Sequence, residues 1–178
     1  MFKLFRSGES KAKITDRVFM HQHGKWNYCL KILAEEPKTI FIGWFDATIA
    51  ELENAIARNN SSPAVILNAK TIHRSQVEGS SIIFIEHHPM KSKEELVFDQ
   101  LGLKEATILS ALDEPLLTLF GGEKLIDIMQ KLGMKGDEII EHKMVSQSIA
   151  NAQKKIEEKL VVEQSVRSQA EWIEINLK

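Results

Sequence analysis

Several features that mark specialised protein classes are scarce in this sequence. One cysteine, Cys29, stands among 178 residues, which excludes an intramolecular disulfide and a zinc site of the multi-cysteine kind. No apolar run approaches the roughly 20 residues that a membrane-spanning helix needs. The first residues, MFKLFRSGES, lack the apolar stretch of a signal peptide. We therefore expect a cytoplasmic protein without an integral membrane segment.

An excess of charge of one sign is missing as well. The chain has 23 Lys and Arg against 25 Asp and Glu, a formal net charge of -2 and a pI near 6.3. Such a chain has no overall positive field to neutralise phosphates, and no basic stripe is interleaved with aromatic side chains, so nucleic acid is not an expected partner. Its hydrophobic fraction of 43% is ordinary for a globular protein, and its length allows a sizeable core.

Short apolar runs alternate with amphipathic stretches in the first two thirds of the chain. Residues 39–45 (TIFIGWF) and 64–67 have the composition of buried strands, and Asp46 is expected to cap a helix at 46–59 between them. An order of strand, helix, strand generates a parallel sheet. The other expected elements are an extended stretch at 14–19, strands at 81–85 and 107–109, and helices at 23–36, 91–101, 113–120 (capped by Asp113) and 123–132.

The end of the chain is expected to form one long helix. Its apolar side chains recur at spacings of three to five residues: Met144, Ile149, Ala152 and Ile156. From about Lys143 this helix should run for about thirty residues, so that it either packs across the α/β body or reaches for a partner. The chain is thus divided into an N-terminal tail (1–13), an α/β domain (14–138) and a C-terminal helical extension (139–178).

Residues 132–158, LGMKGDEIIEHKMVSQSIANAQKKIEE, resemble a known family. They are similar to the junction in SecA, the preprotein translocase motor ATPase, where the second motor domain ends and the long scaffold helix begins. The matching residues are Leu132, Gly133, Met134, Ile140, Glu141, His142, Val145, Ile149, Ala152, Gln153, Lys154, Lys155 and Glu157. So many matches at fixed spacing rarely arise by chance.

The likeness covers about residues 16–158, in the family's order. The further matches are Asp16, Val18, Phe19, Lys25, Ile42, Gly43, Ile49, Glu51, Leu67, Asn68, Ala69, Lys70, Arg74, Glu86, His88, Leu109, Ser110, Asp113, Glu114, Leu119, Phe120 and Gly121. The resemblance implies a RecA-like second helicase lobe. This is an α/β fold of the P-loop NTPase type, with three layers around a parallel sheet, here truncated and followed by a long C-terminal helix. A bacterial protein-export context is implied with it.

The departures from the family pattern lie at the phosphate-binding motifs. Arg74 is followed directly by SQVEGSSIIFI, so a further strand and the GRGTDI loop of the family are missing. Leu103, Lys104 and Glu105 stand where the family motif QLRGRSGRQGDPG has arginines that reach the nucleotide phosphates. No GxxxxGK[ST] loop occurs, and the GGEK cluster at 121–124 lacks its spacing. Because phosphoryl transfer needs positioned cations and these motifs are absent or degenerate, we assign no catalytic residue and expect no ATP hydrolysis.

Four residues at matched positions are candidates for contact with a ligand: Lys70, Arg74, Glu86 and His88. They persist either for packing or for binding a nucleotide. No cofactor is expected, and ATP or ADP is the alternative that these four residues would contact.

The histidines and the cysteine suggest two other kinds of site. His21, His23, His87 and His88 are of a ligand type that metals favour, but no HExxH or CxxC pattern frames them, so no metal site is expected. Cys29 with one of these histidines is the only nucleophile and base pair worth naming. Its place inside an expected helix favours a small core residue instead.

The leading hypothesis is a SecA-like, catalytically inactive binding or regulatory module related to preprotein translocation. Its expected partner is a protein, such as a component of the export machinery, that docks on the C-terminal helix. A cytoplasmic location that is peripheral at the inner membrane fits this role. Two alternatives stay open: a nucleotide-binding subunit that supplies part of an ATP site in trans, and a self-associating structural protein whose C-terminal helix forms a homodimer.

Overall fold

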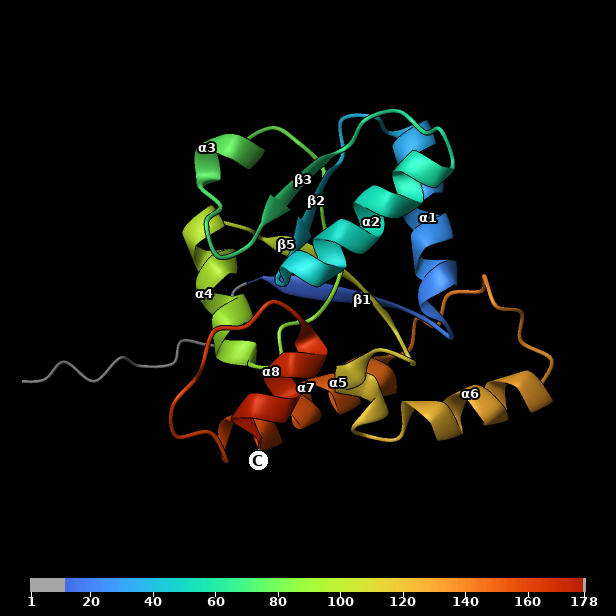
Figure 1. The fold of residues 1–178 in the computed structure, drawn as a ribbon, viewed down its shortest axis with the longest axis vertical. Coiled ribbons are helices and arrows are strands. Elements are labelled where there is room, and N and C mark those ends of the chain that lie inside the picture. The colour runs from blue at the N-terminus through green and yellow to red at the C-terminus, as the bar shows by residue number, and fades with distance from the viewer. Residues whose placement is uncertain (1–11, 178) are drawn as a thin grey trace, which may run out of the picture.

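The computed structural model describes residues 12–177 and contains one sheet of five parallel strands in the order β1-β5-β4-β2-β3 (Figure 1). The strands are β1 (Lys13–Phe19), β2 (Ile40–Gly43), β3 (Val65–Asn68), β4 (Ile82–Phe84) and β5 (Glu105–Ala111). The expected strands are confirmed, and the stretch expected only to be extended is β1, which pairs with β5 along its whole length. Residues 1–11 of the expected tail lie outside the described part.

Eight helices complete the described chain. They are α1 (Gln22–Glu35), α2 (Asp46–Arg58), α3 (Arg74–Val77), α4 (Lys91–Leu101), α5 (Pro115–Thr118), α6 (Gly122–Lys131), α7 (Lys143–Glu157) and α8 (Gln169–Asn176). The helix at 91–101 begins and ends where the sequence predicts, because Gly102 takes a left-handed conformation (φ 69°) that stops it.

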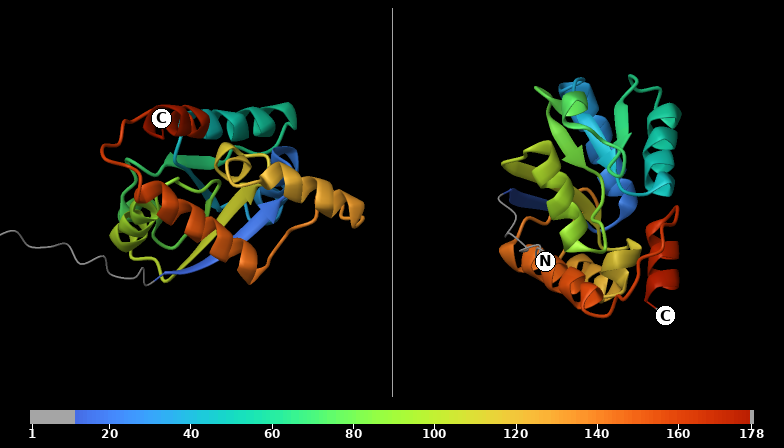
Figure 2. Two further views of the ribbon diagram at one scale, coloured as in Figure 1. Left: turned by 90° about the horizontal axis from the view of Figure 1, so that it is seen from below. Right: turned by 90° about the vertical axis from the view of Figure 1, so that its left-hand side faces the viewer.

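The sheet separates two apolar layers (Figure 2). Phe41 of β2 packs with Leu33 of α1 and Leu52 of α2 on one face. Its neighbour Ile42 packs with Phe98 of α4 on the other face, because successive side chains of a strand point to opposite sides. A smaller cluster joins α5, α6 and α7 at one end of the sheet. The expected three-layer, RecA-like α/β fold is therefore confirmed, in a truncated form.

No strand lies between β3 and β4 in the chain, where the family pattern has a further one. Strand β4 pairs directly with β2, with Phe41 opposite Ile83. The chain passes from β3 to β4 through the four-residue helix α3. Strand β3 is the outermost strand beside β2, and Val65 is 53% exposed. The expectation that β3 is buried is therefore wrong, because an edge strand has a neighbour on one side only.

Both expected helix caps are wrong. Asp46 is the first residue of α2, and its carboxylate accepts a hydrogen bond from Asn68 (3.0 Å). Asp113 caps no helix, since α5 begins at Pro115, and its carboxylate accepts from the backbone N–H of Gln22 (2.9 Å). In each case the carboxylate turns to a partner from another element, which the local pattern cannot reveal.

The C-terminal helix is shorter than expected. Helix α7 ends at Glu157 after 15 residues, so the expected length of about thirty residues is wrong. It packs across the body through Ile149, Ala152 and Ile156. The chain then turns back, and α8 lies beside the start of α2 (Figure 2). Within the described residues, every helix is too short or too polar to cross a membrane.

Candidate functional site

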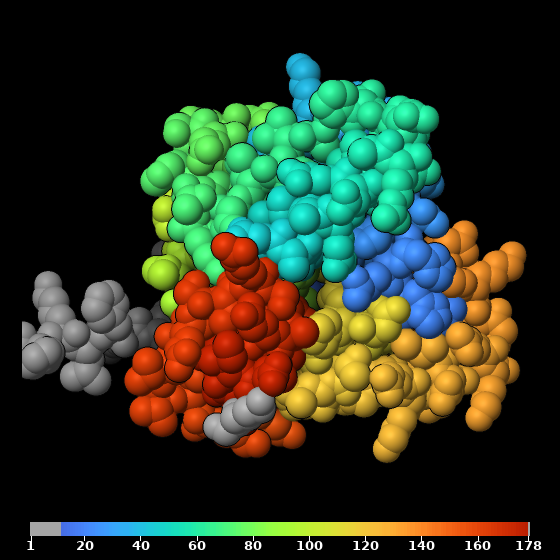
Figure 3. Space-filling view, in the orientation of Figure 1, coloured from blue at the N-terminus to red at the C-terminus, as the bar shows by residue number. Residues whose placement is uncertain are grey.

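The carboxyl ends of the parallel strands meet at one edge of the sheet, which we call the carboxyl edge. Ligands of open α/β folds bind beside this edge. Here the residues that follow α7, called the C-terminal segment (158–177), fold against the starts of α2 and α5 (Figure 3). The chain thus covers with its own residues a place where a ligand would be expected.

Glu86 follows β4 and is buried at the start of α2. Its Oε1 accepts hydrogen bonds from the backbone N–H groups of Trp44 (2.9 Å) and Phe45 (3.0 Å), and its Oε2 accepts from the Thr48 hydroxyl (2.7 Å). Burial raises the pKa of Glu86 to about 7, although these hydrogen bonds and the Lys25 ammonium oppose the shift. Glu86 therefore holds the backbone just before α2 and the Thr48 side chain in its first turn, from a position distant in the sequence.

His88 is enclosed by aromatic rings. Its imidazole stacks on Phe45 (5.8 Å between ring centroids) and makes edge contacts with Trp44 (5.0 Å) and with Trp172 of α8 (5.8 Å). Its Nε2 lies 3.4 Å from the carboxylate of Glu163, and hydrogen bonding to His88 holds the pKa of Glu163 below its ordinary value. His88 is therefore a packing centre for the C-terminal segment.

Lys70 follows β3 and also meets the C-terminal segment. Its Nζ donates to the carbonyl of Val166 (3.3 Å) and lies 5.3 Å from the centre of the Phe45 ring. Beside it, the carbonyl of Arg167 accepts from the backbone N–H of Ala47, in the first turn of α2 (3.0 Å). The first N–H groups of a helix are where a phosphate is commonly held. At α2, the N–H group of Ala47 is bonded to this segment, and Glu86 bonds the N–H groups of Trp44 and Phe45, which lie just before the helix.

Gln169 ties the C-terminal segment to two other elements. Its Oε1 accepts from the backbone N–H of Leu116 (2.8 Å), and its Nε2 donates to the carbonyl of His87 (3.0 Å). Gln169 is buried, and so are its partners Leu116 and His87. A buried side-chain amide is tolerated only when it is hydrogen-bonded. These two bonds therefore fix the position of the start of α8.

A buried ion pair lies beneath this segment. The Nζ of Lys25 in α1 pairs with the carboxylate of Glu114 and donates to the carbonyl of Ile85 (2.8 Å). Burial raises the pKa of Glu114, although Lys25 opposes the shift. A cavity of about 110 Å³ adjoins the pair and has room for a few water molecules. Sequence reasoning missed this pair, and the family match of both residues was its only signal.

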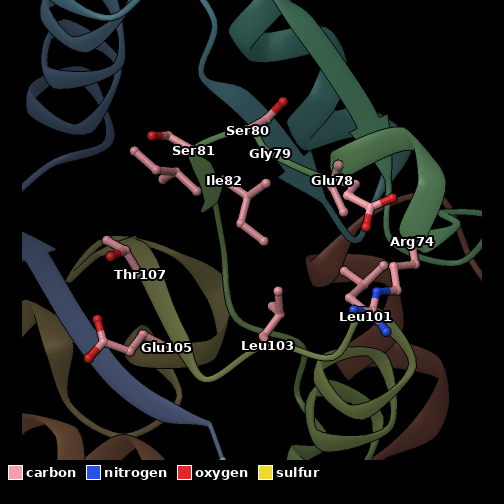
Figure 4. A pocket seen from close by; sticks show the side chains of 12 residues that line it. Arg74, Glu78, Gly79, Ser80, Ser81, Ile82, Leu101, Leu103, Glu105 and Thr107 are labelled. Atoms are coloured by element: carbon pink, nitrogen blue, oxygen red, sulfur yellow. The ribbon is translucent and has the colours of Figure 1, made fainter.

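Arg74 lies elsewhere. It opens α3, and its guanidinium lies close over Gly102 at the end of α4. It lines a cavity of about 520 Å³ at the amino ends of β4 and β5 (Figure 4). Other lining residues are Glu78, Ser80, Ser81, Leu103, Glu105 and Thr107. The structure therefore brings Lys70, Glu86 and His88 together at the carboxyl edge and places Arg74 at the amino edge.

His87 forms a buried cluster with two carboxylates. Its Nδ1 lies 2.9 Å from Glu94 and its Nε2 lies 3.0 Å from Asp16. Burial opposes protonation, but the two carboxylates outweigh it and raise the pKa of His87 to about 10. Both ring nitrogens are thus engaged, and a charged imidazolium bridges the carboxylates.

The remaining candidates for metal or nucleophilic chemistry are His21, His23 and Cys29. His21 and His23 stack on each other (5.5 Å) at the start of α1, away from the His87 cluster. In residues 12–177 no group of histidine, cysteine and carboxylate side chains is arranged to hold a metal ion. Cys29 is buried, and burial raises the pKa of its thiol to about 12, which disfavours the nucleophilic thiolate.

Comparison with known proteins gives the same relationship as the motifs. The protein translocase subunit SecA of Clostridium botulinum (strain Eklund 17B) is 37% identical over 183 aligned positions, which cover 80% of this chain and 22% of that protein. The SecA of Parabacteroides distasonis is 24% identical over 190 positions, covering 84% and 17%. The SecA of Acidithiobacillus ferrooxidans (strain ATCC 53993) is 55% identical over 47 positions, covering 26% and 5%. No protein-family model matches the chain.

The chain spans about a fifth or less of the length of these relatives. The similarity agrees with the parallel five-stranded sheet and with the motifs at the start of α7. The resemblance expected from the sequence is confirmed. This chain is therefore SecA-like, related to the protein translocase subunit SecA over about four-fifths of its own length.

Proposed function

We propose that this chain serves protein translocation as a binding or regulatory module that does not turn over ATP. The relationship to SecA supports a translocation role, and the covered carboxyl edge supports binding without catalysis. The proposed location is the cytoplasm, with a peripheral position at the inner membrane. In this role residues 14–138 form the α/β domain, and residues 139–178 form the extension that presents a surface to a protein partner.

The occupied start of α2 is the observation that carries the proposal. The N–H groups of Trp44 and Phe45 donate to Glu86, and the N–H group of Ala47 donates to Arg167. A phosphate there would have to displace a carbonyl and would face the Glu86 carboxylate. Like charges repel strongly in a buried site, so an anionic nucleotide is disfavoured wherever Glu86 is ionised.

The outward side of α6 and α7 is the proposed partner surface. Its exposed apolar side chains are Phe120 (42%), Leu125 (40%), Ile128 (50%), Leu132 (76%) and Met144 (68%). A largely apolar groove of about 230 Å³ lies between α5, α6 and α7 among them. Exposed apolar patches of this kind commonly mark protein interaction sites. The proposed partner is therefore a translocation protein that presents an apolar segment.

Calorimetric titration tests the nucleotide part of the proposal. We expect no saturable heat when ATP or ADP, with Mg²⁺, is added to the full chain. Saturable binding that is lost in Lys70→Ala would instead favour a subunit that supplies part of an ATP site. Phosphate release from ATP above background, lost on substitution within this chain, would contradict the proposal directly.

Affinity capture from the cells of origin tests the partner. The tagged chain should recover a translocation component, and Met144→Asp on α7 should lose it. The matched control is Leu96→Asp on α4, an equally drastic change at a side chain that is 64% exposed. Equal capture by both variants, or recovery of no translocation component, would overturn the proposal. Light scattering that shows a dimer dissociated by Met144→Asp would favour self-association.

A further inference from the structure

The outer edge of β1 is paired over only part of its length. Val18 and Ile140 exchange two backbone hydrogen bonds (3.2 and 2.7 Å) in an antiparallel bridge. The chain then leaves the edge and begins α7 at Lys143. Positions two and four residues before Val18 point to the same side of the strand, because the direction of backbone N–H and C=O groups alternates. These positions are Asp16 and Ile14, and neither main chain has a hydrogen-bond partner among residues 12–177.

A groove runs along this unpaired part of the edge. It has a volume of about 280 Å³ and lies between β1, the start of α4 and α7. Ile14 forms one wall, and Ile149 and Ala150 of α7 form the other. Polar and charged side chains, among them Lys91, Lys143 and Gln147, also line it. The groove therefore combines apolar walls with polar groups, and it borders the outward main-chain groups of Ile14 and Asp16, which have no partner among residues 12–177. A bound β-strand needs both, because its main chain forms hydrogen bonds with the sheet edge while its side chains are buried in the groove.

A buried carboxylate oxygen of Glu94 lies beside the groove and could accept a further hydrogen bond. Glu94 lines the groove and is 1% exposed. Its Oε1 accepts from His87 (2.9 Å) and from the backbone N–H of His88 (2.8 Å), whereas its Oε2 has no hydrogen-bond partner in the described residues. With the Asp16 carboxylate and the His87 imidazolium, the cluster has a formal charge of -1. A donor group that reached Oε2 would satisfy a buried acceptor whose isolation is costly.

We propose that this groove binds an extended segment of another polypeptide, which adds to β1 as an antiparallel strand. The segment continues the pairing that Ile140 begins and bonds to the main chain of Asp16 and Ile14. It places apolar side chains between Ile14 and Ile149 and an amide or ammonium donor toward Glu94. The bridge at Val18 argues for this occupant, because the same edge already accepts an antiparallel segment of this chain. This groove shares Ile149 with the groove of the proposed function but contains none of the exposed apolar side chains of that patch.

Fluorescence anisotropy with a labelled peptide tests the proposal. The probe is fluorescein-VTKTVT-amide, in which the Val and Lys side chains share one face. The matched control is the same peptide with N-methyl groups on alternate residues, which blocks strand pairing at one edge. We expect saturable binding of the probe to the full chain and no binding of the control. Equal binding of the two peptides, or no binding of either, would overturn strand addition.

Two substitutions locate the binding on the chain. Ile14→Pro removes an outward N–H group without removing a bond to β5, which is the position a strand tolerates for proline. It should weaken binding about tenfold, the effect of losing roughly one well-made hydrogen bond. Glu94→Gln should weaken binding of a lysine-containing probe, and Arg74→Ala at the amino edge should have no effect. Unchanged binding in Ile14→Pro would contradict the assignment.

Amide hydrogen exchange keeps the proposal testable if Ile14→Pro does not fold. In the unsubstituted chain, the probe should slow exchange at the amides of Ile14 and Asp16 and leave Ala47 unchanged. Protection elsewhere only would overturn the assignment. If the chain forms a dimer that shows this protection without peptide, the edge pairs with a second copy and the proposal is wrong.

Discussion

The carboxyl and amino edges of the sheet differ in what occupies them. At the carboxyl edge, Glu86 and His88 are 2% exposed and Trp172 from the C-terminal segment is 1% exposed. At the amino edge, Arg74 borders a cavity of about 520 Å³ between the ends of β4, β5 and α4. Open parallel sheets commonly show the reverse, with a ligand crevice outside the carboxyl ends.

The comparison shows that polar residues at positions matching the SecA pattern serve packing within this chain. Lys70, Glu86 and His88 are all near the carboxyl edge, yet each has a partner from within the chain. Hydrogen-bonded polar groups in a packed interior stabilise one arrangement of the surrounding elements. Arg74 lies at an edge that the C-terminal segment does not reach, so it should matter less to stability.

Removing the aromatic anchor should have the largest effect. Trp172→Ala deletes a buried ring that packs on His88, and it should lower the free energy of unfolding by about 3–5 kcal/mol. Chemical denaturation monitored by far-ultraviolet circular dichroism measures this. Val161→Ala, at a side chain that is 94% exposed, is the control and should change stability by less than about 0.5 kcal/mol. A small effect of Trp172→Ala would show that the segment covers the carboxyl edge only loosely.

Breaking the ion pair beneath the C-terminal segment should come next. Lys25→Met leaves the Glu114 carboxylate buried without its partner and should cost about 3 kcal/mol. The double variant Lys25→Met with Glu114→Leu should recover most of this loss, because the Glu114 carboxylate is removed together with its partner. Thermal unfolding of both variants and the unsubstituted chain provides the comparison. A double variant no more stable than the single one would mean that packing, and not charge, controls this site.

The His87 cluster should make stability depend on pH. The folded pKa of about 10 lies above the ordinary value of 6.5, so the folded state binds more protons between these values. The contribution to stability is therefore complete below about pH 6.5 and is lost as the pH rises through about 10. Denaturation at a series of pH values should show this decline, and His87→Gln should flatten it. An equally steep decline in His87→Gln would assign the effect to another group.

The amino edge should give the smallest effect. Arg74→Ala removes an exposed side chain. The free energy of unfolding should therefore change by less than about 0.5 kcal/mol. The same denaturation measurement applies. A loss as large as that of Trp172→Ala would remove the contrast between the two edges.

Much of the sheet was predictable because its signals are local. The apolar run at β2 and the period of α2 place a strand and a helix without knowledge of the rest of the chain. The end of α4 was predictable because Gly102 tolerates a left-handed conformation. The length of the last helix was not, since neither glycine nor proline follows Glu157 to mark its end.

For the candidate site, the sequence predicted most of the residues but not how they are arranged in space. Motif resemblance selected Glu86, His88 and Lys70, which lie together. It also selected Arg74, which lies at the opposite edge. Nothing in the residues around Glu86 indicates that it bonds the backbone before α2, because its partners Trp44 and Phe45 are some forty positions earlier.

By itself the sequence determined the strands, most helices, the parallel class of the sheet and the relationship to SecA, because these depend on local periodicity and on the order of motifs. Only the tertiary structure decided that the chain covers its own carboxyl edge. That outcome depends on contacts such as Trp172 with His88 and Lys70 with Val166. Residues so far apart in the chain meet only when several elements pack at once, and no local pattern encodes their meeting.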